Sequence, residues 1–171
     1  MIRFVQGDLF ASGCEALVNP VNSVGVMGKG LALQFKRRFP ANFEAYRDAC
    51  ARCAVRPGRC FVFDAGAGLP RFVVNFPTKR HWRDPSRIED IAAGLDDLAG
   101  ILDRRAIRSV AVPPLGCGLG GLPWPRVRSL LLDRLATCEA VSIAVHEPAR
   151  PEWRCACARS NRGRAKGGRR P

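Results

Sequence analysis

Short runs of apolar, often β-branched residues alternate along the chain with segments whose apolar residues recur at helical spacing. The apolar runs predict β-strands over residues 2–6, 16–19, 59–64, 71–76, 107–112 and 141–146. The helical spacing predicts α-helices over residues 30–39, 42–52, 86–104 and 125–136. Because strands and helices alternate, the pattern favours an α/β fold with three layers, in which helices cover both faces of a mixed central β-sheet.

Local signals refine the ends of these elements. Asn42, two residues after Pro40, is a candidate N-cap of the second helix. Ser86 is the candidate N-cap of the third helix, and Glu89 three residues later would complete a capping box. The glycines within 66–68 predict a turn that joins two strands as a hairpin-like pair. Trp124, which stands between two prolines, is expected to pack beneath a glycine-rich loop rather than to contact a ligand.

The length and composition fit a single folded domain with a basic tail. With 171 residues, of which 47% are hydrophobic, the chain can bury the core of one domain, which we assign to residues 1–148. Residues 149–171 lose the apolar pattern and carry eight Lys or Arg against one acidic residue, which predicts a disordered basic tail. The net charge of +13 suits an anionic partner such as a nucleotide or nucleic acid, but equally a solvated arginine-rich surface.

Composition also bears on compartment, metals and assembly. No run of about 18 apolar residues occurs, so no membrane span is predicted. The chain enters its first strand without a basic leader and an apolar signal core, so we expect a cytoplasmic protein with reduced cysteines. Cys50 and Cys53 form a C-x-x-C on a predicted helix with no second pair at zinc-finger spacing, so neither a metal nor a cofactor is predicted. Nothing in the pattern requires more than a monomer.

Three polar or glycine-rich segments follow predicted strands, where ligands bind in open α/β sheets. Asp8 follows the first strand and by itself favours a turn cap. Asn22 and the run G-V-M-G-K-G follow the second strand and lead into a helix whose free N–H groups suit an anion. This run is not a P-loop, because Lys29 precedes its last glycine and no Ser or Thr follows. The run P-P-L-G-C-G-L-G-G is suited to wrap a phosphate or diphosphate with backbone amides.

In their order and spacing, the segments G-D-L, V-N-P-V-N, G-V-M-G-K-G and P-P-L-G-C-G-L-G-G resemble the macrodomain family, an α/β fold that binds ADP-ribose. The resemblance covers about residues 1–147. It implies that Asp8, with Leu9 beside it, holds the adenine, and that Asn22 and a turn surround the distal ribose. That turn consists of Gly28, Lys29 and Gly30. The residues that would cover the diphosphate and ribose are Leu115, Gly116, Cys117, Gly118, Leu119, Gly120 and Gly121.

The run N-F-P-T-K-R-H-W-R resembles the lysine-bearing segment of the macrodomain branch that contains terminal ADP-ribose glycohydrolases and the bacterial antitoxin DarG. This resemblance implies a hydrolase that removes ADP-ribose from thymidine bases in DNA and opposes a DarT-type toxin, with Lys79 as the catalytic residue. An ammonium could donate a proton to the leaving base, whereas a neutral amine could attack C1″ of the ribose. The residues leave both mechanisms open.

Basic and aromatic side chains follow Lys79 directly. Arginines can contact phosphates and aromatic rings can stack on unpaired bases, so the predicted contacts to single-stranded DNA are Arg80, His81, Trp82 and Arg83. The resemblance adds that relatives acting on proteins carry an aspartate where this chain has Gly120. Two alternatives remain open: a module that binds ADP-ribose without cleaving it, and a glycohydrolase of glutamate-linked ADP-ribose on proteins.

Overall fold

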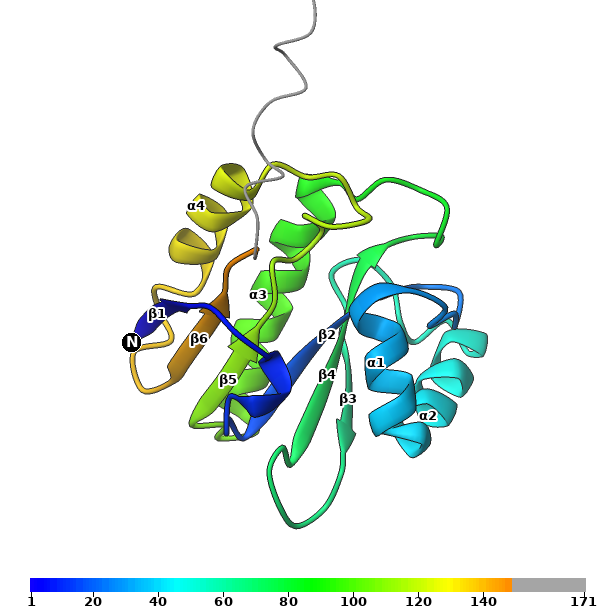
Figure 1. The fold of residues 1–171 in the computed structure, drawn as a ribbon, viewed down its shortest axis with the longest axis horizontal. Coiled ribbons are helices and arrows are strands. Elements are labelled where there is room, and N and C mark those ends of the chain that lie inside the picture. The colour runs from blue at the N-terminus through cyan, green and yellow to red at the C-terminus, as the bar shows by residue number, and fades with distance from the viewer. Residues whose placement is uncertain (149–171) are drawn as a thin grey trace, which may run out of the picture.

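The structure is a computed structural model that describes residues 1–148. Within these residues one six-stranded sheet has the strand order β1-β6-β5-β2-β4-β3 (Figure 1). Neighbouring strands run parallel, except that β3 is antiparallel to β4. The strands are β1 (Ile2–Val5), β2 (Ala16–Asn22), β3 (Phe61–Asp64), β4 (Phe72–Lys79), β5 (Ser109–Val112) and β6 (Ser142–His146).

Helices cover both faces of the sheet. The α-helices are α1 (Gly30–Arg38), α2 (Pro40–Ala51), α3 (Ile88–Arg104) and α4 (Trp124–Arg134), and a short 3-10 helix, η1 (Leu9–Ala11), follows β1. Helices α3 and α4 pack on one face and α1 and α2 on the other, which gives the predicted three-layer α/β fold (Figure 1). The hairpin of β3 and β4 is also as predicted.

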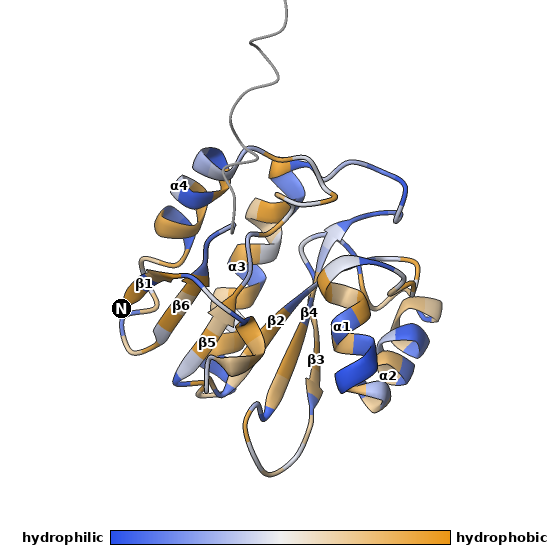
Figure 2. Ribbon diagram, in the orientation of Figure 1, coloured by the Kyte–Doolittle hydropathy of each residue, from blue (hydrophilic) through white to orange (hydrophobic). Residues whose placement is uncertain are grey.

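The alternation of side chains along the strands builds both cores. In β2, Ala16 and Val18 belong to the cluster under α3 and α4, whereas Leu17 packs with Phe35 of α1 on the other face. The central strands are therefore apolar on both sides and are coloured mostly hydrophobic in Figure 2, whereas the helices combine hydrophobic and hydrophilic residues. Trp124 is 4% exposed and meets Phe4 edge-on, so its packing role is confirmed.

Strands β2 and β4 extend three residues further than the sequence predicted. Their polar ends stay in the parallel ladder, where Asn19 pairs with Asn75 and Asn22 pairs with Lys79. A register shift between Val21 and Asn22 accompanies this pairing. The prediction ended at these polar and proline residues because a proline in a strand interior removes a ladder hydrogen bond. The extension matters because it places Lys79 inside β4 rather than in the following loop.

Both predicted helix caps are wrong. Helix α2 begins at Pro40, and Asn42 is a buried residue inside it whose amide bonds Asn75 of β4. Helix α3 has Arg87 at its N-cap position, with no side-chain capping bond. The buried Ser86 precedes it and donates its backbone N–H to the Gly120 carbonyl at 3.0 Å. The Asn42 side chain bonds β4, whereas Ser86 is held through its backbone N–H, so neither side chain caps its helix.

The remaining predictions concern features outside this core. The predicted basic tail, residues 149–171, lies outside the described residues. Among residues 1–148, no helix is long and apolar enough to cross a membrane, and no group of three or more His, Cys, Asp or Glu side chains is placed to hold a metal. Cys50 and Cys53, like the other described cysteines, are free thiols.

Candidate active site

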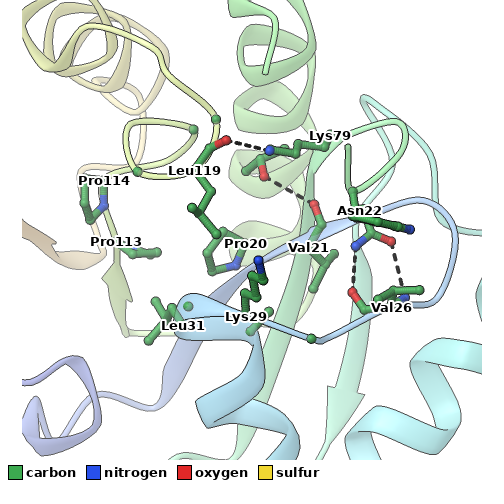
Figure 3. Close-up of a pocket in the computed structure, with 18 residues that line it drawn as sticks. Pro20, Val21, Asn22, Val26, Lys29, Leu31, Lys79, Pro113, Pro114 and Leu119 are labelled. Atoms are coloured by element: carbon green, nitrogen blue, oxygen red, sulfur yellow. Dashed lines mark hydrogen bonds between the residues drawn. The ribbon is translucent and has the colours of Figure 1, made fainter. Parts of the chain in front are cut away.

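A cavity of about 470 Å³ opens beyond the carboxyl ends of β2, β4 and β5 (Figure 3). Three chain segments form its walls: the β2–α1 loop, the end of β4, and the glycine-rich loop that follows β5. Ligands of open α/β sheets bind at this edge. Of the predicted ligand and catalytic residues, the cavity is lined by Asn22, Gly28, Lys29, Gly30, Lys79, Gly116, Gly118, Leu119 and Gly120.

Asn22 organises the β2–α1 loop. Its side-chain oxygen accepts from the backbone N–H groups of Val24 and Val26, at 3.1 and 3.3 Å, and its amide nitrogen donates to the Val26 carbonyl at 2.6 Å (Figure 3). One amide hydrogen of Asn22 therefore remains for a ligand at the cavity wall. The residue is both a scaffold of the loop and a candidate binding group.

The amino end of α1 faces the same cavity. Lys29 occupies the N-cap position without a side-chain capping bond, and Gly30 follows with φ +60°, a backbone conformation that favours glycine. The first N–H groups of a helix carry partial positive charge and attract anions. The Lys29 side chain is exposed and forms no ion pair within residues 1–148. This wall of the cavity is therefore cationic.

The glycine-rich loop folds back on itself through backbone hydrogen bonds. The N–H of Leu122 donates to the Gly116 carbonyl, and that of Gly121 donates to the Gly118 carbonyl, both at 3.0 Å. In the described part of the chain, the N–H groups of Gly118, Leu119 and Gly120 donate to no protein acceptor. Successive free amides in a concave loop bind phosphate oxygens. The loop therefore presents three successive free N–H groups, the arrangement on which the predicted diphosphate site depends.

Lys79 spans the gap between β4 and this loop. Its ammonium nitrogen donates to the Leu119 carbonyl at 2.6 Å (Figure 3). Directly before it, the buried Thr78 donates its hydroxyl to the Val21 carbonyl at 3.2 Å, which holds the end of β4 against β2. The predicted catalytic lysine thus stands at the cavity wall, half-buried, next to the free amides of the glycine-rich loop.

The charges in the cavity are all positive. Among the residues described, Lys29 and Lys79 are the ionisable side chains that line it, and no carboxylate does. A side chain at Gly120 is also excluded in this loop conformation, because its Cβ would overlap the Ser86 hydroxyl oxygen and the Gly116 carbonyl oxygen. The cavity can therefore stabilise an anionic ligand, and residues 1–148 offer it no carboxylate that would act as a general base.

Several predicted ligand residues lie off the cavity. Asp8 accepts from the Phe10 N–H at 3.0 Å as the N-cap of η1, and it forms an exposed ion pair with Arg38 at 3.7 Å. Leu9 is a core residue. Three residues of the glycine-rich loop do not line the cavity: Leu115, Cys117 and Gly121. Leu115 is buried, and burial raises the pKa of the Cys117 thiol to about 12.

The predicted DNA-contact segment divides into two parts. Arg80 forms a bidentate pair with the buried Asp90 of α3, at 3.1 and 3.2 Å, and this pairing raises the pKa of Arg80. The next three side chains form a stack: the His81 and Trp82 ring centroids lie 5.3 Å apart, and the Arg83 guanidinium lies 4.5 Å from the Trp82 ring centre. Trp82 is 46% exposed and lines the cavity, whereas the other three do not.

Sequence reasoning missed the buried polar groups behind the site. Asn75 of β4 accepts from Asn19 of β2 at 2.9 Å and donates to Asn42 of α2 at 2.7 Å, and all three side chains are fully buried. Tyr46 of α2 donates its hydroxyl to the Asn22 carbonyl at 2.7 Å. The spacing of Asn42 and Tyr46 places them on one helix face, which was the available signal. The strand partners become visible only with the register.

Comparison with known proteins places this site in a family. The macro domain family model matches residues 18–131. The chain is 54% identical over 149 residues to a DNA ADP-ribosyl glycohydrolase of Thermus aquaticus, covering 86% of this chain and 41% of that protein. It is 50% identical to a DNA ADP-ribosyl glycohydrolase of Mycobacterium tuberculosis, covering 86% of this chain and 42% of that protein. The chain therefore spans about two fifths of the length of these curated relatives.

Solved structures agree with this assignment. The macrodomain of Thermus aquaticus DarG superposes with a TM-score of 0.84 at 54% identity, covering 86% of this chain and 99% of that chain. Thermosipho africanus DarTG in complex with ADP-ribose superposes with a TM-score of 0.82 at 36% identity, covering 86% of this chain and 42% of that chain. The six-stranded mixed sheet, the helices on both faces and the family match lead to one conclusion: this chain belongs to the macro domain family.

Proposed function

We propose that this macrodomain is a metal-independent hydrolase that removes ADP-ribose from thymidine bases in DNA. The observation that carries the proposal is the position of Lys79, which reaches from β4 to the glycine-rich loop across a cavity that no carboxylate of residues 1–148 lines. The names of the relatives from Thermus aquaticus and Mycobacterium tuberculosis, both DNA ADP-ribosyl glycohydrolases, support the same activity.

The walls of the cavity match the parts of ADP-ribose. The free amides of Gly118, Leu119 and Gly120 suit the diphosphate oxygens. The cationic wall at Lys29 suits the negative charge of the same diphosphate. The distal ribose then lies between Asn22 and Lys79. The adenine extends toward Asp8 and Leu9, where the exposed ion pair of Asp8 with Arg38 is weak enough for a ligand to displace.

The proposed reaction breaks the bond between C1″ of the distal ribose and the thymine nitrogen. Positive charge develops on the sugar, and the base keeps the electron pair and gains a proton. Water supplies the hydroxyl at C1″, so the products are ADP-ribose and unmodified DNA. The Lys79 side chain either donates a proton to the leaving base or attacks C1″ before water does. Both routes place its nitrogen beside the scissile bond, and neither requires a carboxylate at residue 120.

The base must leave a duplex to reach this cavity, so the substrate is single-stranded or locally unpaired DNA. The exposed Trp82 ring at the cavity rim is the candidate stacking surface, and Arg83 beside it is the candidate phosphate contact. Arg80 has a structural role instead, because Asp90 holds its guanidinium. His81 supports the Trp82 ring.

A DarT-type transferase is the proposed source of the substrate. A Thermosipho africanus relative, 35% identical over 163 residues, is named a DNA ADP-ribosyl transferase–DNA ADP-ribosyl glycohydrolase fusion protein. The macrodomain of this chain would then act on the product of such a transferase. We propose that it counteracts such a transferase by removing the modification from DNA.

One assay with two substrates tests the proposal. Wild type and Lys79→Ala are incubated with ADP-ribosylated single-stranded DNA and, separately, with glutamate-linked ADP-ribose on a protein. Lys36→Ala is the matched control, because Lys36 lies on α1 against the Phe43 ring and away from the cavity. We expect wild type and the control to release ADP-ribose from DNA and Lys79→Ala to release none. Tight binding of ADP-ribose without cleavage of either substrate would instead assign a noncatalytic binding module.

A further inference from the structure

Tyr46 of α2 is the largest fully buried side chain behind the cavity, with 0% of its surface exposed. Its hydroxyl donates to the Asn22 carbonyl at 2.7 Å and lies 3.2 Å from the Asn22 side-chain oxygen. Burial and the neighbouring Cys50 thiol raise the pKa of Tyr46, so the hydroxyl stays protonated and remains a donor. A buried hydroxyl that reaches into a neighbouring loop fixes that loop relative to the helix.

The contact falls on the residue that closes the β2–α1 loop. Asn22 holds both the N–H and the carbonyl of Val26 with its side chain, at 3.3 and 2.6 Å. The Tyr46 hydroxyl therefore fixes the position of Asn22, whose side-chain bonds hold this loop in shape. Helix α2 is anchored a second time by Asn42, one helical turn earlier, on Asn75 of β4. These two bonds set the distance between α2 and the paired ends of β2 and β4.

The same loop is bonded to the segment that carries Lys79. The Ser23 N–H donates to the Arg80 carbonyl at 3.3 Å, and the Ser23 hydroxyl donates to the Lys79 carbonyl at 3.5 Å. In the β2–β4 ladder, Asn22 pairs with Lys79 directly after the register shift. The backbone of Lys79 is thus held from one side by residues 22 and 23. The direction in which its side chain leaves β4 depends on that contact, since each strand residue alternates between the two faces.

We propose that Tyr46 is a positioning residue for Lys79. The Tyr46 hydroxyl fixes Asn22 and thereby sets the register shift that points Lys79 at the glycine-rich loop. This inference rests on the proposed function of Lys79. Tyr46 does not line the cavity, so its effect passes through Asn22 and Ser23. A catalytic group displaced by about 1 Å can lose roughly a hundredfold in rate, whereas ligand binding by the glycine-rich loop is left intact.

Tyr46→Phe removes only the hydroxyl and keeps the ring. We expect kcat for release of ADP-ribose from single-stranded DNA to fall at least roughly fivefold, with the affinity for free ADP-ribose changed less than about twofold. Val55→Ala is the matched control, because Val55 is buried in the same cluster and bonds neither Asn22 nor Ser23. It should destabilise the protein to a similar degree while kcat stays at the wild-type value.

Two results would overturn the inference. One is wild-type kcat in Tyr46→Phe; the other is an equal loss of kcat in Val55→Ala, which would reduce the effect to general destabilisation. Crystal structures of wild type and Tyr46→Phe decide the point independently of turnover. We expect the Ser23 to Lys79 contact and the Lys79 to Leu119 bond to be altered in the variant, and unchanged positions would refute the role. A wild type without activity would refute the proposed function, and the structures would still test the link from Tyr46 to Lys79.

Discussion

Gly118 offers a clean way to block the proposed diphosphate site. A Cβ at this position would meet no heavy atom within 4 Å, and Gly118 does not adopt positive φ. Gly118→Glu should therefore fold normally while its carboxylate projects into the amide-lined part of the cavity. Two unit charges about 5 Å apart at an effective dielectric constant of about 20 repel by about 3 kcal/mol. Because the diphosphate carries more than one charge, we expect the ADP-ribose affinity to fall by at least roughly a hundredfold.

Calorimetric titration with ADP-ribose measures the loss, and thermal unfolding without ligand checks the fold. Gly118→Ala is the control, since it adds a small neutral group in the same open space and keeps the backbone amide. Its affinity should stay within a few-fold of wild type, and both variants should unfold within about 0.5 kcal/mol of wild type. Unaltered affinity in Gly118→Glu would refute the placement of the diphosphate on this loop.

Three further predictions follow from the same geometry. Gly120→Ala should both destabilise the protein, by about 1–3 kcal/mol in urea unfolding, and weaken ADP-ribose binding, because its Cβ overlaps Ser86 and the loop backbone; wild-type stability would mean that the loop relaxes freely. Asn75→Ala should cost about 2–5 kcal/mol, because it leaves buried amides on two other elements without partners, and a loss below 1 kcal/mol would contradict this network. Trp82→Ala should raise KM for a modified oligonucleotide roughly tenfold with a much smaller change in ADP-ribose affinity, and equal losses would argue against base stacking.

The fold and the cavity walls were predictable because their signals are local. The apolar runs located every strand, and the glycine-rich segments after β2 and β5 do form two walls of one cavity. A loop of glycines at a strand end has few structural uses other than close approach to a ligand. Lys79 was found from the motif around it, and the structure places its nitrogen on Leu119 of the opposite wall.

The polar support of the site was not predictable, because it depends on pairing between distant segments. Asn42 and Ser86 have ideal N-cap chemistry, yet tertiary contacts bury both away from any cap. Arg80 looked like a phosphate contact, and only the fold reveals that Asp90, ten residues later, holds its guanidinium. Tyr46 shares a helix face with Asn42, but that spacing does not reveal its partner, which lies 24 residues away across the β2–α1 loop.

We propose that Lys79 performs the chemistry and that the cavity binds ADP-ribose without it. The most direct test measures both properties of Lys79→Ala: calorimetric affinity for ADP-ribose, and single-turnover release of ADP-ribose from a modified oligonucleotide, followed by mass. We predict an affinity within roughly tenfold of wild type, with the oligonucleotide retaining its modification while wild type restores the unmodified mass. Release by Lys79→Ala at the wild-type rate would contradict the assignment of Lys79 as the catalytic residue.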